Sequence, residues 1–180
     1  MGKKGTLRAD SASYGQDGRA SESQEYPIAA FDYRTPGWYF VTICTRGRIC
    51  LLGRVADGEV LLSAAGLIVE QEWLRTADRR PYVMLDTHVV MPNHVHGLIM
   101  IRDHAHDATP VQARSPSHSL SSTVGGFKSV SSRRIAVLSP NYRCAIRQRS
   151  YSERVVRDID ELNTVRKYIA NNPACWRAGI

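Results

Sequence analysis

Two histidines separated by one valine, His94 and His96, form the clearest candidate metal-binding pair in the sequence. Side chains at positions i and i+2 of a β-strand point to the same face, so two imidazoles at this spacing can share one divalent ion. Leu98 and Met100 continue that face. The spacing predicts a metal site if the segment is a strand; the alternative is two structural histidines that stand partly exposed on a sheet.

A second pair with the same spacing, His104 and His106, lies in a different setting. Residues 102–119 are polar and contain Pro110 and Pro116 among Asp, His and Ser, which predicts a long loop. Because such a loop does not hold two imidazoles in a fixed geometry, we do not expect a metal site here.

Tyr168 and Asn172 are four residues apart in a segment with a helical pattern, which places them one turn apart on the same face. A hydroxyl nucleophile needs deprotonation or a nearby positive charge, and a metal ion that polarises the target phosphate lowers this requirement. Arg166 and Lys167 would favour the approach of a phosphate. Tyr168 is therefore a candidate nucleophile; the alternative is a packing tyrosine whose hydroxyl faces water.

The sequence is basic, and its excess charge is concentrated near the C-terminus. The 180 residues include 24 Lys and Arg against 17 Asp and Glu, a net charge of +7. Residues 133–180 contain ten basic and four acidic side chains and so hold +6 of this excess. All but one of the ten are arginines, whose planar guanidinium group matches phosphate oxygens. A phosphate-rich partner is indicated; a solvated basic face is the alternative.

The composition is that of a folded, water-soluble protein. Hydrophobic residues make up 43% and charged residues 23% of the chain, and no apolar run reaches the ~18 residues of a membrane span. The four cysteines form no CxxC pair, so neither a disulfide framework nor a zinc ribbon is expected. Residues 1–25 lack periodic apolar positions and are predicted to be a flexible arm, followed by one domain over residues 26–180.

Strands must position the histidine pair. Aromatic and β-branched residues predict a strand over Trp38–Cys44. Pro92 and Asn93 predict a tight turn between antiparallel strands over residues 82–90 and 94–101, the second of which carries both histidines.

A hairpin and three helices complete the predicted elements. Asp57-Gly58 is a hairpin signal flanked by the apolar pieces Ile49–Leu52 and Glu59–Leu62. The first helix runs from its cap Ser63 to about Asp78, with an amphipathic pattern at Leu67, Ile68, Gln71, Trp73 and Leu74. The second covers residues 120–138, around Val124, Phe127, Val130 and Ile135. The last is capped by Asp158 with Glu161 and ended by Pro173.

Hairpins followed by helices, without a repeating β-α-β period, imply an α+β domain with an antiparallel sheet and helices on one face.

Four ordered segments carry a resemblance to a known family. The string Val89-Val90-Met91-Pro92-Asn93-His94-Val95-His96-Gly97-Leu98 resembles the hallmark of the single-tyrosine HUH transposases of insertion-sequence type, and the chain is similar to the REP-associated tyrosine transposases among them. The other three segments are Tyr39–Arg46, Gly126-Phe127-Lys128-Ser129 and Glu161–Pro173. The resemblance covers roughly residues 26–176.

This resemblance implies a ferredoxin-like fold and an endonuclease and strand transferase acting on single-stranded DNA that forms hairpins. His94, His96 and Asn172 would bind a divalent metal ion, Mg²⁺ or Mn²⁺, and Tyr168 would form a 5′-phosphotyrosine link. It also implies a bacterial cytoplasmic protein at the nucleoid, monomeric or homodimeric, with no membrane association.

Candidate DNA contacts follow from the same resemblance and from the basic C-terminal quarter. They are Lys128, Arg147, Arg149, Arg154, Arg157, Arg166 and Lys167. The segment Arg147–Arg154 departs from the family pattern, because it lacks a tryptophan, a second aromatic residue and a histidine that relatives often have there.

Two other functions remain open on the sequence. A small antiparallel sheet with aromatic residues and a basic C-terminus would also suit a non-catalytic nucleic-acid-binding module. A metal-dependent hydrolase that activates water is the third interpretation; it would cleave without Tyr168 but not without His96.

Overall fold

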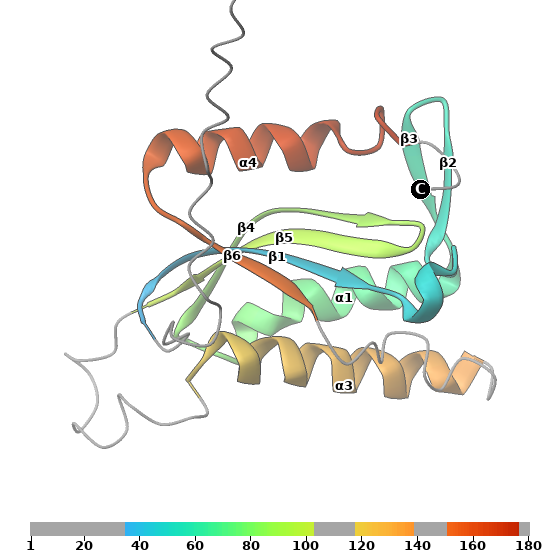
Figure 1. Cartoon of the computed structure of the whole chain (residues 1–180). Helices are drawn as coiled ribbons and strands as arrows, with labels where there is room; N and C mark the ends of the chain where they lie inside the picture. The colour runs from blue at the N-terminus through green and yellow to red at the C-terminus, as the bar shows by residue number, and fades with distance from the viewer. Residues whose placement is uncertain (1–34, 103–117, 139–150, 177–180) are drawn as a thin grey trace, which may run out of the picture. The chain divides into compact units, whose positions relative to one another are not determined.

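The computed structural model describes residues 35–102, 118–138 and 151–176 (Figure 1). In chain order its elements are β1 (Gly37–Cys44), the short 3-10 helix η2 (Arg46–Arg48), β2 (Gly53–Ala56), β3 (Glu59–Leu62), α1 (Ala64–Asp78), β4 (Val83–Met91), β5 (His94–Ile101), α3 (Leu120–Leu138), β6 (Ser152–Val156) and α4 (Ile159–Asn171). The predicted N-terminal arm and the pair His104 and His106 lie outside the described residues. Among the described helices, none is long and apolar enough to cross a membrane.

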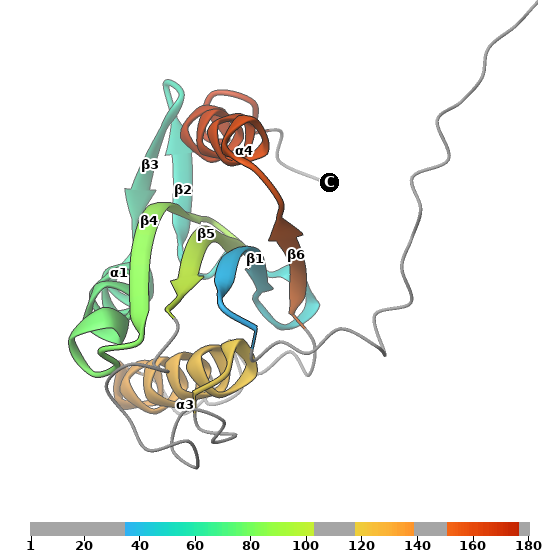
Figure 2. The ribbon, with the colours of Figure 1, turned by 90° about the vertical axis from the view of Figure 1, so that its left-hand side faces the viewer.

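Four strands form an antiparallel sheet in the order β4-β5-β1-β6. Two helices, α1 between β1 and β4 and α3 between β5 and β6, cover one face of this sheet (Figure 2). Two crossover helices on one face of a sheet with this strand order give the ferredoxin-like arrangement. The predicted fold class is confirmed, and α4, which follows the last strand, adds a layer on the opposite face (Figure 2).

The face of the sheet under α1 and α3 holds the larger core. Tyr39, Val41 and Ile43 alternate along β1 and point toward this core, as expected for a strand with a period of two. On β5 the matching residue is Gly97, where an added Cβ would lie 2.2 Å from Cζ2 of Trp73. Gly97 therefore allows the indole of α1 to lie directly on the strand that carries the two histidines.

The first predicted helix is confirmed, but its buried stripe differs from the predicted one. Ser63 caps α1 by accepting a hydrogen bond from the backbone N–H of Gly66 at 3.1 Å. Leu67 and Leu74 are about half exposed, whereas the buried positions are Ala65, Gly66, Val69, Glu72, Trp73 and Thr76. Leu67 and Leu74, seven residues apart, therefore form a stripe beside the buried one. The buried stripe contains the carboxylate of Glu72.

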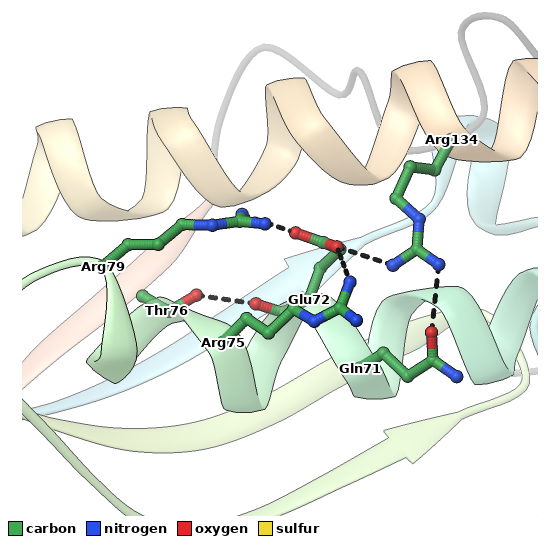
Figure 3. Close-up of polar contacts among 6 residues, drawn as sticks. All are labelled: Gln71, Glu72, Arg75, Thr76, Arg79 and Arg134. Atoms are coloured by element: carbon green, nitrogen blue, oxygen red, sulfur yellow. Dashed lines mark hydrogen bonds and ion pairs between the residues drawn. The ribbon is translucent and has the colours of Figure 1, made fainter.

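That carboxylate, Glu72, is the polar centre of the junction between α1 and α3 (Figure 3). Its oxygens accept hydrogen bonds from Arg75 at 3.2 Å, Arg79 at 2.7 Å and Arg134 of α3 at 2.6 Å. Burial raises the pKa of Glu72, but the three guanidinium groups outweigh it and the pKa lies below its ordinary value. The three positive partners explain how a charged side chain occupies this core position.

The small hairpin has the predicted turn but a different first arm. Asp57 and Gly58 have φ of 53° and 77° and form a two-residue turn, so the residues next to them must pair. The first arm is therefore Gly53–Ala56, not Ile49–Leu52. Leu52 has another role, because its side chain is buried in the core and its N–H bonds to the carbonyl of Pro92 at 2.9 Å.

The opposite face of the sheet holds a smaller core formed with α4. Leu162, Val165 and Ile169 of α4 pack with Leu98 of β5 and Val156 of β6.

The predicted start of α4 is also confirmed. The Asp158 side chain accepts from the N–H of Glu161 at 2.7 Å, and the Glu161 carboxylate accepts from the N–H of Arg157 at 2.9 Å. The cap fixes where the helix begins, and the apolar stripe fixes which side faces β5.

Candidate active site

The two histidines lie side by side on the α4 face of β5. The turn at Pro92 and Asn93 starts the strand at His94, and alternation puts His96 on the same face. Their ring centroids are 4.4 Å apart. Across the sheet, β1 places Cys44 opposite His94 and Thr42 opposite His96.

Helix α4 brings Tyr168 over this pair. The Tyr168 hydroxyl lies 3.4 Å from Nε2 of His96, and the two ring centroids are 5.3 Å apart. The tyrosine side is open to solvent, since Tyr168 is 51% exposed while His96 is only 7% exposed. The predicted nucleophile is therefore accessible and in contact with a predicted metal ligand, although 72 residues separate them in the chain.

Phe40 is a site residue that the sequence analysis did not single out. Its ring centroid lies 5.3 Å from that of His96 and 5.9 Å from that of Tyr168. Phe40 and Thr42 share a face of β1, so strand alternation was the available signal, but only the pairing of β1 with β5 shows which residues they face.

Both imidazoles are held in the neutral form. The pKa of His94 is lowered to about 4, mainly by burial and also by the positive charge of Arg48, while the Asn172 side chain acts in the opposite direction. Burial, and then the charge of His94, lowers the pKa of His96 to about 3. Neutral imidazole is the form that binds metal ions.

The residues present fit a divalent metal ion. Nε2 of His94 is buried and has no hydrogen-bond partner among the described residues, although Asn172 lies near enough to influence its pKa. Within residues 35–102, 118–138 and 151–176, no group of three or more His, Cys, Asp or Glu side chains could hold a metal. The amide oxygen of Asn172, whose side chain acts on the pKa of His94, is of a type that suits Mg²⁺ or Mn²⁺.

The predicted DNA contacts are distributed over several places. Arg154 extends from β6, opposite Phe40, and its Nε lies 3.4 Å from the Glu161 carboxylate. Arg157 and Lys167 are exposed, the first just before α4 and the second on it. Arg166 binds the carboxylate of Asp86 on β4, with its Nη2 2.5 Å from Oδ2.

Lys128 is not brought to the site. It lies on α3, which covers the other face of the sheet (Figure 2). Its Nζ lies 6.0 Å from the centroid of the Tyr151 ring. Arg147 and Arg149 lie outside the described residues.

Two further residues lie near the histidines without having been predicted. The charge of Arg48 acts on His94 from the loop after β1, and the ring centroid of Trp176 lies 5.9 Å from that of His94. Neither has a sequence signal of its own, because both reach the site through the paths of loops.

Comparisons with known proteins show similarity in sequence to a curated protein and similarity in fold to solved structures. No model of a known protein family matches the chain. A protein of Haemophilus influenzae named only as uncharacterized is 32% identical over 155 residues, which are 81% of this chain and 85% of the relative. A solved structure of a REP-associated tyrosine transposase bound to a REP hairpin is similar in fold, with a TM-score of 0.56, 17% identity, and 80% of this chain and 70% of that chain covered.

Proposed function

The chain belongs to the same family as the Haemophilus influenzae protein and shares its fold with a REP-associated tyrosine transposase, and on this premise we propose that it is a transposase-like, metal-dependent endonuclease and strand transferase. The transposase of similar fold was solved with a REP hairpin bound. By analogy, the proposed substrate of this chain is single-stranded DNA that folds into hairpins. The nucleophile is Tyr168.

The observation that carries this proposal is the contact between α4 and β5. An exposed tyrosine hydroxyl lies 3.4 Å from Nε2 of His96, and the neighbouring His94 has a buried Nε2 without a hydrogen-bond partner in the described part of the chain. A packing tyrosine does not explain why it contacts a buried imidazole, with a half-buried second one beside it, both in neutral form. A phosphate next to both histidines would be within reach of the Tyr168 oxygen, as an attacking group requires.

The reaction balances without another reagent. The Tyr168 oxygen forms a bond to a backbone phosphorus, the bond from phosphorus to the 3′ oxygen breaks, and the phenol proton ends on the released 3′-hydroxyl. The downstream strand stays attached to Tyr168 through its 5′-phosphate, as a phosphotyrosine. Because one phosphodiester replaces another, the energy of the broken bond is kept, and a 3′-hydroxyl can reverse the reaction at the same or another DNA end.

His94, His96 and Asn172 would hold the metal ion. When bound, Mg²⁺ or Mn²⁺ would act as a Lewis acid on the phosphate. The protein contributes neutral imidazoles, an amide oxygen and a helix that presents the tyrosine. Arg154, Arg157 and Lys167, exposed on or near α4, supply positive charge for the DNA backbone.

The test is formation of a covalent protein–DNA species. Purified protein is incubated with a library of single-stranded hairpins and Mn²⁺, and denaturing gels reveal any adduct. We expect adduct with the wild type and none with Tyr168→Phe, while Tyr168→Phe still binds the hairpin. Tyr151→Phe, which changes a tyrosine that contacts Ser121 of α3, is the matched control and keeps full adduct yield.

Each other outcome points to a different function. Adduct formation by Tyr168→Phe would show that the nucleophile is assigned wrongly. Hairpin binding without adduct formation, whether Mn²⁺ or Mg²⁺ is added, would indicate a non-catalytic binding module. Cleavage that survives in Tyr168→Phe but is lost in His96→Ala would indicate hydrolysis by activated water.

A further inference from the structure

Each site histidine has a side-chain partner at its Nδ1 atom. Nδ1 of His94 lies 2.7 Å from Oδ1 of Asn93, and Nδ1 of His96 lies 2.9 Å from Oγ1 of Thr42. A neutral imidazole has one N–H group and one lone pair. A group at Nδ1 that can only accept a hydrogen bond therefore leaves Nε2 with a lone pair, which can bind a metal ion.

The orientation of the Asn93 amide is fixed by a second contact. Asn93 is 6% exposed, and its Nδ2 donates to the carbonyl of Arg48 at 3.3 Å. The amide oxygen is thus the atom that faces His94. Because this oxygen can only accept, Nδ1 of His94 must donate, and Nε2 carries the lone pair.

The loop after β1 is shaped to provide that carbonyl. Gly47 and Arg48 both have φ in the left-handed region, 64° and 53°, which a residue with a Cβ such as arginine rarely adopts. The same loop binds the backbone of Asn93, whose carbonyl accepts from the N–H of Thr45 at 2.8 Å and from its hydroxyl at 3.0 Å. Three contacts to one loop hold Asn93 in place.

At His96 both ring nitrogens face hydroxyl groups. The Thr42 hydroxyl at Nδ1 and the Tyr168 hydroxyl, 3.4 Å from Nε2, can each donate or accept. The geometry therefore assigns a tautomer to His94 alone.

We propose that Asn93 is a positioning residue that holds His94 as the Nδ1–H tautomer, with its Nε2 lone pair available before any ion binds. The inference rests on the proposed function for the nature of the ion, but the tautomer is a property of the metal-free protein. Such partners fix the ring and the basicity of a ligating histidine, and their loss lowers metal affinity about 10–100-fold.

The first test needs neither metal nor DNA. Long-range ¹H–¹⁵N NMR of ¹⁵N-histidine-labelled, chelator-treated protein distinguishes a protonated ring nitrogen from one with a lone pair. We expect His94 to have the hydrogen on Nδ1. A hydrogen on Nε2 of His94 in the wild type would overturn the inference.

The second test compares two variants of Asn93. Asn93→Asp and Asn93→Leu both lose the N–H donated to Arg48, but only the aspartate keeps an acceptor for His94. We expect Asn93→Asp to keep the Nδ1–H tautomer and to bind Mn²⁺ within about threefold of wild type. Asn93→Leu should populate the Nε2–H tautomer and weaken Mn²⁺ binding, followed by electron paramagnetic resonance, about 10–100-fold.

The outcomes separate this inference from the proposed function. An unchanged tautomer together with unchanged Mn²⁺ affinity in Asn93→Leu overturns the role of Asn93. If Asn93→Leu does not fold, the wild-type spectrum and the Asn93→Asp variant decide the question. If His94 of the wild type has the expected tautomer but the protein binds no Mn²⁺, the positioning role stands and the proposed metal-dependent function fails.

Discussion

Phe40 joins the two halves of the candidate active site, because its ring contacts both His96 on the sheet and Tyr168 on the helix. The Tyr168 ring meets it edge to face, with an interplanar angle of 89°. Aromatic pairs of this geometry contribute about 0.5–1.5 kcal/mol beyond the burial of their area. The contact restricts where the tyrosine hydroxyl can lie relative to the histidines.

Replacement of Phe40 by leucine therefore separates packing from positioning. Phe40→Leu keeps an apolar side chain, so we expect the free energy of unfolding to fall by less than about 1.5 kcal/mol. Loss of the edge contact should reduce the rate of adduct formation about threefold to tenfold. Urea denaturation and single-turnover gels measure the two effects, and an unchanged adduct rate would show that Phe40 has no positioning role.

Sequence reasoning reached the residues of the site whose spacing is local. The pairs His94 with His96 and Tyr168 with Asn172 follow from the periods of a strand and a helix. Thr42, Phe40 and Arg48 could not be found in this way, because they reach the histidines through the pairing of β1 with β5 and the path of a loop. Asn93 was part of the predicted turn, but its contact with Nδ1 of His94 depends on the orientation of its amide.

At the scale of elements, the position of α4 decides whether Tyr168 reaches the histidines. The apolar residues Leu162, Val165 and Ile169 attach the helix to the sheet. A polar contact at the edge strand also orients the helix, because Arg166 of α4 donates hydrogen bonds to both carboxylate oxygens of Asp86 on β4. The hydrogen bond from Arg166 lowers the pKa of Asp86 to about 2.

This contact predicts a pH dependence of stability. The pKa of Asp86 is lower in the folded chain than its ordinary value of 3.8, so its contribution is complete above that value and is lost as the pH falls toward about 2. We expect Asp86→Asn to lower the free energy of unfolding by roughly 1–2 kcal/mol at neutral pH. The difference between wild type and variant should shrink between about pH 4 and pH 2.

Urea denaturation at several pH values measures that difference. Asp160→Asn, which removes a carboxylate from the first turn of the same helix, is the control and should change stability by less than about 0.5 kcal/mol. A wild-type-to-variant difference that stays constant down to pH 2 would show that the Asp86–Arg166 pair does not stabilise the docking of α4.

The elements themselves were largely predictable, and the deviations have physical causes. Caps and turns at Ser63, Asp158 and Asp57-Gly58 fix boundaries through local hydrogen bonds and backbone angles. The burial of Glu72, with Leu67 left half exposed, was not predictable. It requires the positive charge of Arg134 on α3, which is 62 residues away in the chain. Long-range charge compensation leaves no periodic pattern in the sequence.

At the scale of the molecule, the basic residues that make up the excess positive charge have different roles in the structure. Arg134 and Arg166 belong to ion pairs that join helices to their neighbours, with Glu72 and Asp86 respectively. Arg157 and Lys167 are exposed on or near α4, and so is Arg154, although it also pairs with Glu161. The concentration of charge in residues 133–180 is thus only in part a surface for DNA, and the sequence alone could not separate the two uses.

The positions of the lysines predict which of them contributes to the salt dependence of hairpin binding. Lys167 lies on the helix that carries Tyr168, whereas Lys128 lies on α3, across the sheet (Figure 2). Each phosphate contact contributes about one to the slope of log K against log salt concentration. We expect Lys167→Ala to weaken hairpin binding at low salt and to reduce this slope by about one, and Lys128→Ala to leave it unchanged. Fluorescence anisotropy titrations over a range of salt concentrations measure both slopes. If the slope fell equally in the two variants, the DNA backbone would contact both faces of the sheet and not the α4 face alone.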